Sequence, residues 1–200
     1  MRDVDWTVYQ TLLAARGEKP RPRLAYLDGS VEIMTTSRRH EIIKTMIARL
    51  TTAYVEERGG ILDGTGGETL EHKNEEAGAE ADETYFVGPM KPFPDLVIEV
   101  VLTHGGIDKL EIYRRMRVGE AWFWIDGEIK AYRLVQGRYR EVQHSIAVPG
   151  IDLVEIAKLS TNTTTEQLQV VRAYRAAIKA RIAASAPSPS KPRKRTIRRR

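Results

Sequence analysis

A glutamate, Glu99, interrupts a run of branched apolar residues, LVIEVVL, over residues 96–102. Such a run predicts a central strand that is buried on both faces of a sheet. An ionised carboxylate inside that strand costs several kcal/mol unless a cation pairs with it or a metal ion binds it. Glu99 therefore indicates either a buried ion pair with an arginine or a functional site.

Two aspartates lie close to this strand along the chain. Asp82 precedes a short predicted strand over residues 84–87, and Asp95 opens the strand that carries Glu99. Carboxylates at the ends of adjacent strands suit Mg²⁺, a hard ion that prefers oxygen ligands and keeps water molecules for chemistry. We rank Asp95 below Asp82, because an aspartate in a Pro-Asp turn often only positions the strand. The pattern favours a magnesium site around Asp82 and Glu99.

Other kinds of site fit the sequence less well. The chain has no cysteine, which excludes a disulfide framework, a thiolate metal site and a cysteine nucleophile. Its histidines show no His-x-x-x-His spacing, which argues against a histidine zinc site. They are His40, His72, His104 and His144. His104 follows the strand of Glu99 and could act as a base, although a histidine in a loop more often has no catalytic role.

The predicted elements alternate between helices and strands, as in an α/β fold. The spacing of apolar residues predicts helices over 4–16, 38–58, 107–117 and 165–184. Strands are expected over 24–27, 31–34, 84–87, 96–102, 121–125, 129–134 and 139–142. The segment 61–81, rich in Gly and Glu, is interpreted as short edge strands and an exposed loop with solvated charges. Trp122, Phe123 and Trp124 alternate between two faces, which we interpret as core on one face and an interface on the other.

Positive charge is concentrated at the end of the chain. The net charge is +5, but the last ten residues, KPRKRTIRRR, hold seven of the 32 basic residues and no acid, so the rest is slightly acidic. We expect one domain over 1–184 and a disordered basic tail over 185–200, because 186–190 is too poor in apolar side chains to order itself. The tail is either a solubility appendage or a sequence-independent contact to nucleic acid. Its basic residues are Lys191, Arg193, Lys194, Arg195, Arg198, Arg199 and Arg200.

Three ordered blocks of sequence resemble the Uma family of endonucleases: YLDGSVEIMTTSRRHE, EADETYFVG and PDLVIEVVLTHGGIDKLEIYRRMRVGEAWFW. The resemblance covers roughly residues 24–155, and the last block is its most specific part. This family resembles the PD-(D/E)XK, or restriction-endonuclease-like, nucleases. The resemblance implies a mixed β-sheet core flanked by helices, here with an N-terminal helix, a β-hairpin and a C-terminal helix.

The resemblance also implies roles for individual residues. Asp82 matches the motif aspartate, and Glu99 matches the acid of the (D/E)XK element. Val101 stands where the superfamily pattern has lysine, and the superfamily is known to move this lysine to a nearby helix. Lys109 is then the candidate catalytic lysine. Glu41 matches the helical acid that often completes the metal site in such nucleases.

The implied activity is hydrolysis of phosphodiester bonds in DNA by an endonuclease that depends on Mg²⁺, with Mn²⁺ as a substitute ion. Asp82, Glu99 and Glu41 would hold the metal, and Lys109 would stabilise the developing negative charge. The alternative is an inactive module that binds nucleic acid or protein and keeps the nuclease fold. Val101 and the slightly acidic body favour this alternative.

The sequence also bears on assembly and location. Enzymes of this superfamily that cut both strands often act as dimers, so a homodimer is expected. The start, MRDVDWTVYQ, has no signal-peptide core, and no apolar run reaches the roughly 18 residues that span a bilayer. We therefore expect a cytoplasmic protein without a membrane partner.

Overall fold

The computed structural model of the chain describes residues 1–19, 21–103, 106–162 and 165–185. The α-helices of these residues are α1 (Trp6–Arg16), α2 (Arg38–Glu57), α3 (Lys109–Arg115), α4 (Leu153–Ser160) and α5 (Gln167–Ser185). The strands are β1 (Arg23–Leu27), β2 (Ser30–Met34), β3 (Asp63–Gly66), β4 (Thr69–His72), β5 (Ala77–Glu80), β6 (Glu83–Phe86), β7 (Leu96–Val101), β8 (Glu120–Ile125), β9 (Glu128–Val135) and β10 (Arg138–Val142). A short 3₁₀ helix, η1 (Lys73–Glu75), connects β4 to β5.

The strands form two sheets. The larger sheet has the order β10-β9-β8-β7-β6-β3, and the smaller sheet has the order β2-β1-β5-β4. In the larger sheet β7 and β8 are parallel, whereas the other neighbours are antiparallel. A mixed sheet with helices packed against it confirms the α/β, restriction-endonuclease-like fold class that the sequence predicts.

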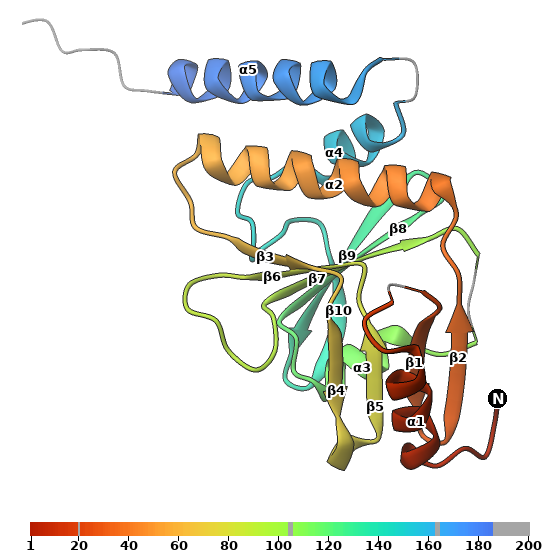
Figure 1. Cartoon of the computed structure of the whole chain (residues 1–200). Helices are drawn as coiled ribbons and strands as arrows, with labels where there is room; N and C mark the ends of the chain where they lie inside the picture. The colour runs from red at the N-terminus through yellow and green to blue at the C-terminus, as the bar shows by residue number, and fades with distance from the viewer. Residues whose placement is uncertain (20, 104–105, 163–164, 186–200) are drawn as a thin grey trace, which may run out of the picture.

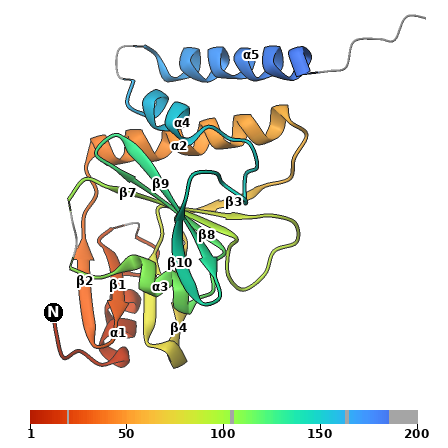
Figure 2. The ribbon, with the colours of Figure 1, turned by 180° about the vertical axis from the view of Figure 1, so that it is seen from behind.

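The helices and sheets are stacked in layers (Figures 1 and 2). α2, α4 and α5 lie on one side of the larger sheet, with α5 outermost beyond α2. α3 lies between the sheets and shares a hydrophobic cluster with β5, β7 and β8. α1 covers the other side of the smaller sheet, where Tyr9 packs with Leu24 and Tyr26. The hairpin β1–β2 is thereby held beside the carboxyl end of β7, next to the start of α2.

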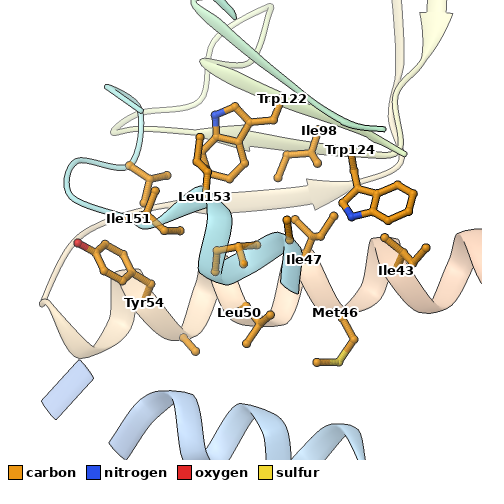
Figure 3. Close-up of a cluster of buried hydrophobic side chains, with 14 of the residues drawn as sticks. Ile43, Met46, Ile47, Leu50, Tyr54, Ile98, Trp122, Trp124, Ile151 and Leu153 are labelled. Atoms are coloured by element: carbon orange, nitrogen blue, oxygen red, sulfur yellow. The ribbon is translucent and has the colours of Figure 1, made fainter. Parts of the chain in front are cut away.

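The largest core lies between α2 and the larger sheet (Figure 3). Ile47 and Leu50 on α2 pack in one cluster with Ile98, Trp122 and Trp124 from β7 and β8, and all five side chains are almost completely buried. Burial of a large apolar side chain contributes about 1.5–3 kcal/mol. This core therefore fixes the position of α2 on the sheet, and with it the position of the helix start near β7.

The strand that carries Glu99 is central, as the sequence predicts. β7 lies between β6 and β8, and its residues from Leu96 to Val100 are at most 5% exposed. The glutamate is therefore inside the protein, on the face of the sheet that α3 covers.

Two predictions from the sequence are wrong in part. The segment 61–81 does contain short edge strands, β3 and β4, but it also contains β5, which pairs with both β1 and β4 and is buried over its whole length. Its small residues make this possible, because a Cβ atom at Gly78 would lie 2.6 Å from the Tyr9 hydroxyl. Trp122, Phe123 and Trp124 do alternate between faces, but both faces are core, since the cluster around α3 covers Phe123.

Smaller differences concern the helices and the end of the chain. The sequence does not predict α4, and α3 begins at Lys109 because the Asp108 side chain caps it by accepting a hydrogen bond from the Glu111 amide. The sequence predicts the tail from residue 185, but Ser185 ends α5; residues 186–200 lie outside the described residues, and so does His104. Among the described residues, no helix combines the length and apolarity needed to cross a membrane.

Candidate active site

Antiparallel pairing between β6 and β7 brings Asp82 to Glu99. Glu83 pairs with Ile98 and Thr84 with Val97, so the same register continued by one residue sets Asp82 opposite Glu99. Side chains at opposite positions of an antiparallel pair have Cβ atoms about 4.5–5.5 Å apart. Both carboxylates are buried, with exposed fractions of 1% for Asp82 and 2% for Glu99. The structure thus places the two acids side by side, away from bulk water.

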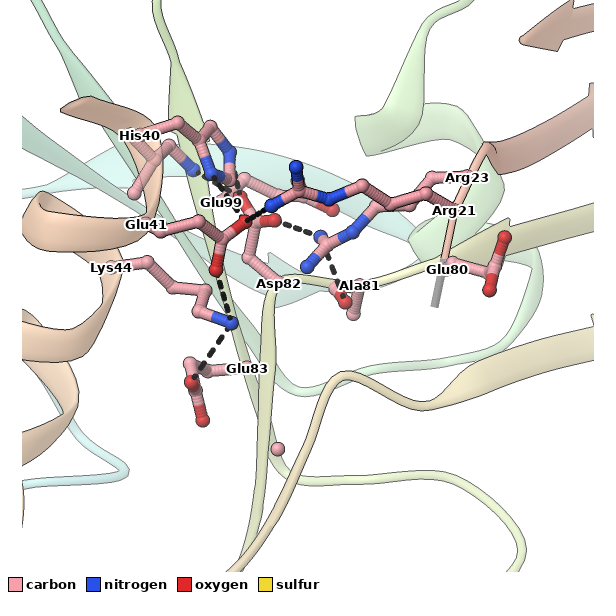
Figure 4. Close-up of polar contacts among 12 residues, drawn as sticks. Arg21, Arg23, His40, Glu41, Lys44, Glu80, Ala81, Asp82, Glu83 and Glu99 are labelled. Carbon is pink, nitrogen blue, oxygen red and sulfur yellow. Dashed lines mark hydrogen bonds and ion pairs between the residues drawn. The ribbon is translucent and has the colours of Figure 1, made fainter. Parts of the chain in front are cut away.

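Asp82 is held by groups from three directions (Figure 4). The Val100 amide donates a hydrogen bond of 2.7 Å to Oδ2, and His40 Nε2 lies 3.0 Å from the same oxygen. The Arg23 guanidinium forms an ion pair with Oδ1. Burial opposes ionisation of Asp82, but the hydrogen bond from His40 and the charges of Arg23 and Lys109 outweigh it and lower the pKa to about 2. Asp82 is therefore ionised at neutral pH.

Glu99 is held by two side chains of α3. Lys109 Nζ lies 2.7 Å from Oε2, and the Tyr113 hydroxyl donates a hydrogen bond to Oε1. Lys109 and Tyr113 are four residues apart, so they lie on one face of the helix and reach the same carboxylate. Burial raises the pKa of Glu99; the charge of Lys109 opposes this, whereas the charge of Asp82 adds to it. The two neighbouring acids thus have pKa values shifted in opposite directions, as in many catalytic carboxylate pairs.

Glu41 lies near this pair but has partners of its own. Its carboxylate is 3.0 Å from Lys44 Nζ and 3.3 Å from Arg21 Nη2, and the His40 ring lies between it and Asp82. Burial opposes ionisation, but the nearby Thr36 hydroxyl and the ion pair with Lys44 lower the pKa of Glu41 to about 2. The His40 ring thus separates the Glu41 carboxylate from Asp82. The role of Glu41 as a metal ligand stays a prediction.

Asp95, which the sequence ranks below Asp82, shapes a loop. It accepts a hydrogen bond of 2.8 Å from the Val87 amide, and its own backbone amide donates to the Tyr85 carbonyl. It opens β7 four residues before Glu99, about 13 Å away along a strand. Asp95 therefore orients the connection between β6 and β7.

A cavity of about 500 Å³ opens onto the two acids. At one end it is lined by Asp82, Glu99, Lys109, His40 and Arg23. A second hollow, of about 650 Å³, lies between the start of the chain, β2 and Ile107, and its only acid is Glu32 among the described residues. The first cavity is smaller, but the grouped charges make it the candidate active site.

The acid pair fits a hard divalent cation. Mg²⁺ prefers oxygen ligands and is commonly bound by one or two protein carboxylates, with water and substrate phosphate completing its shell. Asp82 and Glu99 supply two buried carboxylates that face one cavity. In the described part of the chain, no group of three or more His, Asp or Glu side chains is arranged to hold a metal ion. A site here would therefore depend on the two acids together with water and phosphate.

The sequence does not predict three of the residues that contact the acid pair. Arg23 is separated from Asp82 by 59 positions and meets it because β1 pairs with β5, whose continued register sets Arg23 beside Ala81 and Asp82. His40 lies next to Glu41 in the block SRRHE. Its place at the start of a predicted helix could have indicated that its side chain faces the sheet. Tyr113 follows Lys109 by four residues, a spacing that places both on one helix face. His40 and Tyr113 could therefore have been found from their spacing to Glu41 and Lys109, whereas no nearby residue in the sequence indicates Arg23.

The opposite pKa shifts predict opposite effects on stability. The lowered pKa of Asp82 stabilises the fold above the ordinary value near 3.8, and this stability is lost as the pH falls toward 2. The raised pKa of Glu99 means that its ionisation costs stability as the pH rises above about 4.5. In metal-free buffer at pH 7.5, Glu99→Gln should raise the melting temperature by about 2–4 °C, which corresponds to roughly 1 kcal/mol for a chain of this size.

Asp82→Asn should have the reverse effect. It removes the charge that pairs with buried Arg23 and should lower the melting temperature by about 6 °C or more, since breaking a buried ion pair costs about 3–5 kcal/mol. Calorimetric melting of both variants beside the unchanged protein is the measurement. Equal destabilisation by the two substitutions would contradict the assignment of opposite shifts.

Comparison with known proteins identifies a family and a similar fold. Residues 6–164 match the model of the Uma2 family, described as "Putative restriction endonuclease". A crystal structure described as a "putative nuclease belonging to DUF820", from Anabaena variabilis ATCC 29413, has a similar fold, with a TM-score of 0.50 and 12% sequence identity over 74% of this chain and 96% of that one. A search of curated proteins finds no match. Since the family model spans most of the chain and includes Asp82, Glu99 and Lys109, the chain belongs to the Uma2 family of putative restriction endonucleases.

Proposed function

We propose that this protein is a Mg²⁺-dependent endonuclease that hydrolyses phosphodiester bonds of DNA, with Mn²⁺ as an effective substitute. The observation that carries the proposal is the buried pair Asp82–Glu99, which faces a cavity with Lys109 Nζ 2.7 Å from Glu99. The ionisation of buried Glu99 costs folding free energy, and a catalytic role explains why this acid is kept beside Asp82. The family match supports a nuclease; the ion and the DNA substrate are part of the proposal.

The residues around the pair have separate tasks in this mechanism. Asp82 and Glu99 would hold the ion, which when bound polarises the scissile phosphate and lowers the pKa of a water molecule. Arg23 and His40 keep Asp82 ionised and fixed, and Tyr113 orients Glu99. These partners restrict the carboxylates to one geometry, so little reorganisation is needed when substrate arrives.

Lys109 would supply the positive charge that stabilises the phosphate as negative charge develops. Val101 occupies the position two residues after Glu99, where the superfamily pattern has lysine. Lys109 reaches Glu99 from the start of α3 and lines the cavity, so its ammonium group is available at the same place. This supports the displacement of the lysine from the strand to the helix.

Cleavage of circular DNA tests the proposed function. The purified chain should convert circular single-stranded DNA and supercoiled plasmid to linear or nicked forms with Mg²⁺ or Mn²⁺, and should leave both intact with EDTA. Circular substrates have no ends, so cleavage of them identifies an endonuclease. Sedimentation in the same buffer tests the homodimer that cutting of both strands would use.

The alternative function is binding without turnover. It is favoured by the ion pairs already present, because Arg23 and Lys109 neutralise the two acids without any metal. The same experiment separates the candidates. DNA that is retained in a gel-shift assay but never cut with any divalent ion would support the binding module.

The basic tail is proposed to contact phosphates outside the active site. Removing residues 191–200 should weaken DNA binding and flatten its salt dependence, because each lost contact reduces the slope of log affinity against log salt by about 0.9 on duplex DNA. Metal-dependent cleavage should remain. A chain with the same ten residues in scrambled order is the matched control and should keep the slope. An unchanged slope after removal would identify the tail as a solubility appendage.

A further inference from the structure

The cavity beside the two acids also has apolar lining. Six of its side chains, termed the apolar slot, are Met34, Val101, Ile107, Leu110, Phe123 and Ile125, and polar residues of β2, of the segment before α2 and of the segment before α3 line other parts of the cavity. Phe123 is 8% exposed, and the other five are partly exposed while packing against the cluster around α3. None of the six side chains is charged or can form a hydrogen bond through a nitrogen or oxygen atom. The slot is therefore suited to an apolar, flat group and not to water or phosphate.

The slot begins directly beside Glu99. In the parallel pair β7–β8, Glu99 lies opposite Phe123 and Val101 lies opposite Ile125. Val101 is two residues from Glu99 on the same face of the strand, a separation of roughly 7 Å. A phosphate held at the acid pair would therefore lie directly beside the apolar slot.

We propose that the apolar slot binds an unpaired nucleobase of the nucleotide whose phosphate lies at Asp82 and Glu99. The whole cavity, which includes the acid pair and the slot, has a volume of about 500 Å³, within the range of pockets that hold small ligands, about 300–1,000 Å³. In continuous duplex DNA a base is stacked and paired, so it enters a pocket only when it is extruded or already single-stranded. The preferred substrate is then single-stranded or locally unpaired DNA. This inference rests on the proposed function and specifies its substrate.

The slot also explains the residue at position 101. A lysine there would point from the same strand face as Glu99 into the slot and place an ammonium group among apolar side chains. Valine keeps this surface apolar, while Lys109 carries the charge from α3 at the polar end. The departure from the superfamily pattern and the apolar slot are thus two parts of one arrangement.

Binding to a strand without bases is the direct test. Fluorescence anisotropy, with Ca²⁺ in place of Mg²⁺ to slow cleavage, compares oligothymidylate with an abasic oligomer of equal length. The unchanged protein should bind oligothymidylate about tenfold more tightly, within the range for stacking of one base on an aromatic side chain. It should also bind oligothymidylate more tightly than a duplex of that length once the tail is removed. Equal affinity for the natural and abasic strands would overturn the proposal.

Variants of the slot show where the preference resides. Ile125→Ser makes the slot polar and Val101→Phe fills it; either one should reduce the tenfold preference to about twofold or less, with affinity for the abasic strand unchanged. Ile61→Ser, at a residue that is 71% exposed and outside the cavity, is the matched control and should keep the preference. Melting curves confirm folding of each variant, and the comparison of strands on the unchanged protein stands even if one variant does not fold. A slot variant that folds and keeps the full preference would also overturn the proposal.

The result separates this inference from the proposed function. A preference for bases without any cleavage of DNA would retain the slot and contradict the nuclease. Metal-dependent cleavage with equal affinity for natural and abasic strands would retain the nuclease and contradict the slot.

Discussion

Asp82→Asn and Glu99→Gln should each lower the rate of metal-dependent DNA cleavage by about 10³ or more. Each substitution keeps the size of the side chain and removes one of the two negative charges that would hold the ion, so the stabilisation of the reacting phosphate is lost with it. Because Glu99→Gln should also raise the melting temperature, its loss of activity cannot come from unfolding. A single-turnover assay on labelled single-stranded DNA measures both rates.

Glu83→Gln is the matched control for these two variants. Glu83 is the next residue after Asp82, but its carboxylate lies 3.9 Å from Lys44 on the side of α2. It should retain cleavage within about twofold, since it does not line the cavity. Activity retained by Glu99→Gln and lost in Glu83→Gln would reverse the assignment of the acids.

Lys109→Ala should lower the cleavage rate by about 10²–10³, the effect of removing one preorganised electrostatic group. DNA affinity should change much less, because one phosphate contact is a small part of a binding site. Full activity in this variant would remove Lys109 from the mechanism. Lys44, 3.0 Å from Glu41, would then be the next lysine to test.

A second substitution returns the charge to the strand. Lys109→Ala combined with Val101→Lys should regain part of the lost rate, because residue 101 shares the strand face of Glu99. The same double variant should lose its preference for natural over abasic strands, since the lysine enters the apolar slot. Circular dichroism must accompany the assay to confirm that the buried site accepts the longer side chain. A rate no higher than that of Lys109→Ala would show that position 101 cannot supply the charge.

Much of the fold could be predicted because its signals are local. The run around Glu99 predicts a buried central strand, and the apolar spacing over 38–58 predicts α2, whose start the Ser37 side chain caps in the structure. β5 could not be predicted in the same way. Its residues Ala77 and Gly78 have low strand propensity alone and are buried only by tertiary packing, Ala77 in the cluster around α3 and Gly78 against Tyr9 of α1.

The residues of the candidate site could likewise be predicted only where their signal is local. The acids could be found because a carboxylate in an apolar strand violates a local rule, and such violations often mark function. Their partners come from distant segments: Arg23 reaches Asp82 only because β1 pairs with β5, the strand that ends just before Asp82. Only the family resemblance groups Glu41 with the two acids. In the structure, Glu41 forms ion pairs with Lys44 and Arg21. The contacts made by Arg23 and Arg21 depend on tertiary structure and leave no spacing in the sequence, whereas Lys44 is three residues from Glu41 on the same helix.

A crystal structure with bound Mn²⁺ tests the central claim most directly, because anomalous scattering locates the ion without reference to activity. We expect one Mn²⁺ at the cavity, bound by a carboxylate oxygen of Asp82 and one of Glu99 at about 2.1 Å, with water in the remaining positions. Crystals of Glu99→Gln under the same conditions should lack the peak. A Mn²⁺ ion bound elsewhere, or no ion at a concentration that supports cleavage, would contradict the assignment of Asp82 and Glu99 as the metal-binding pair.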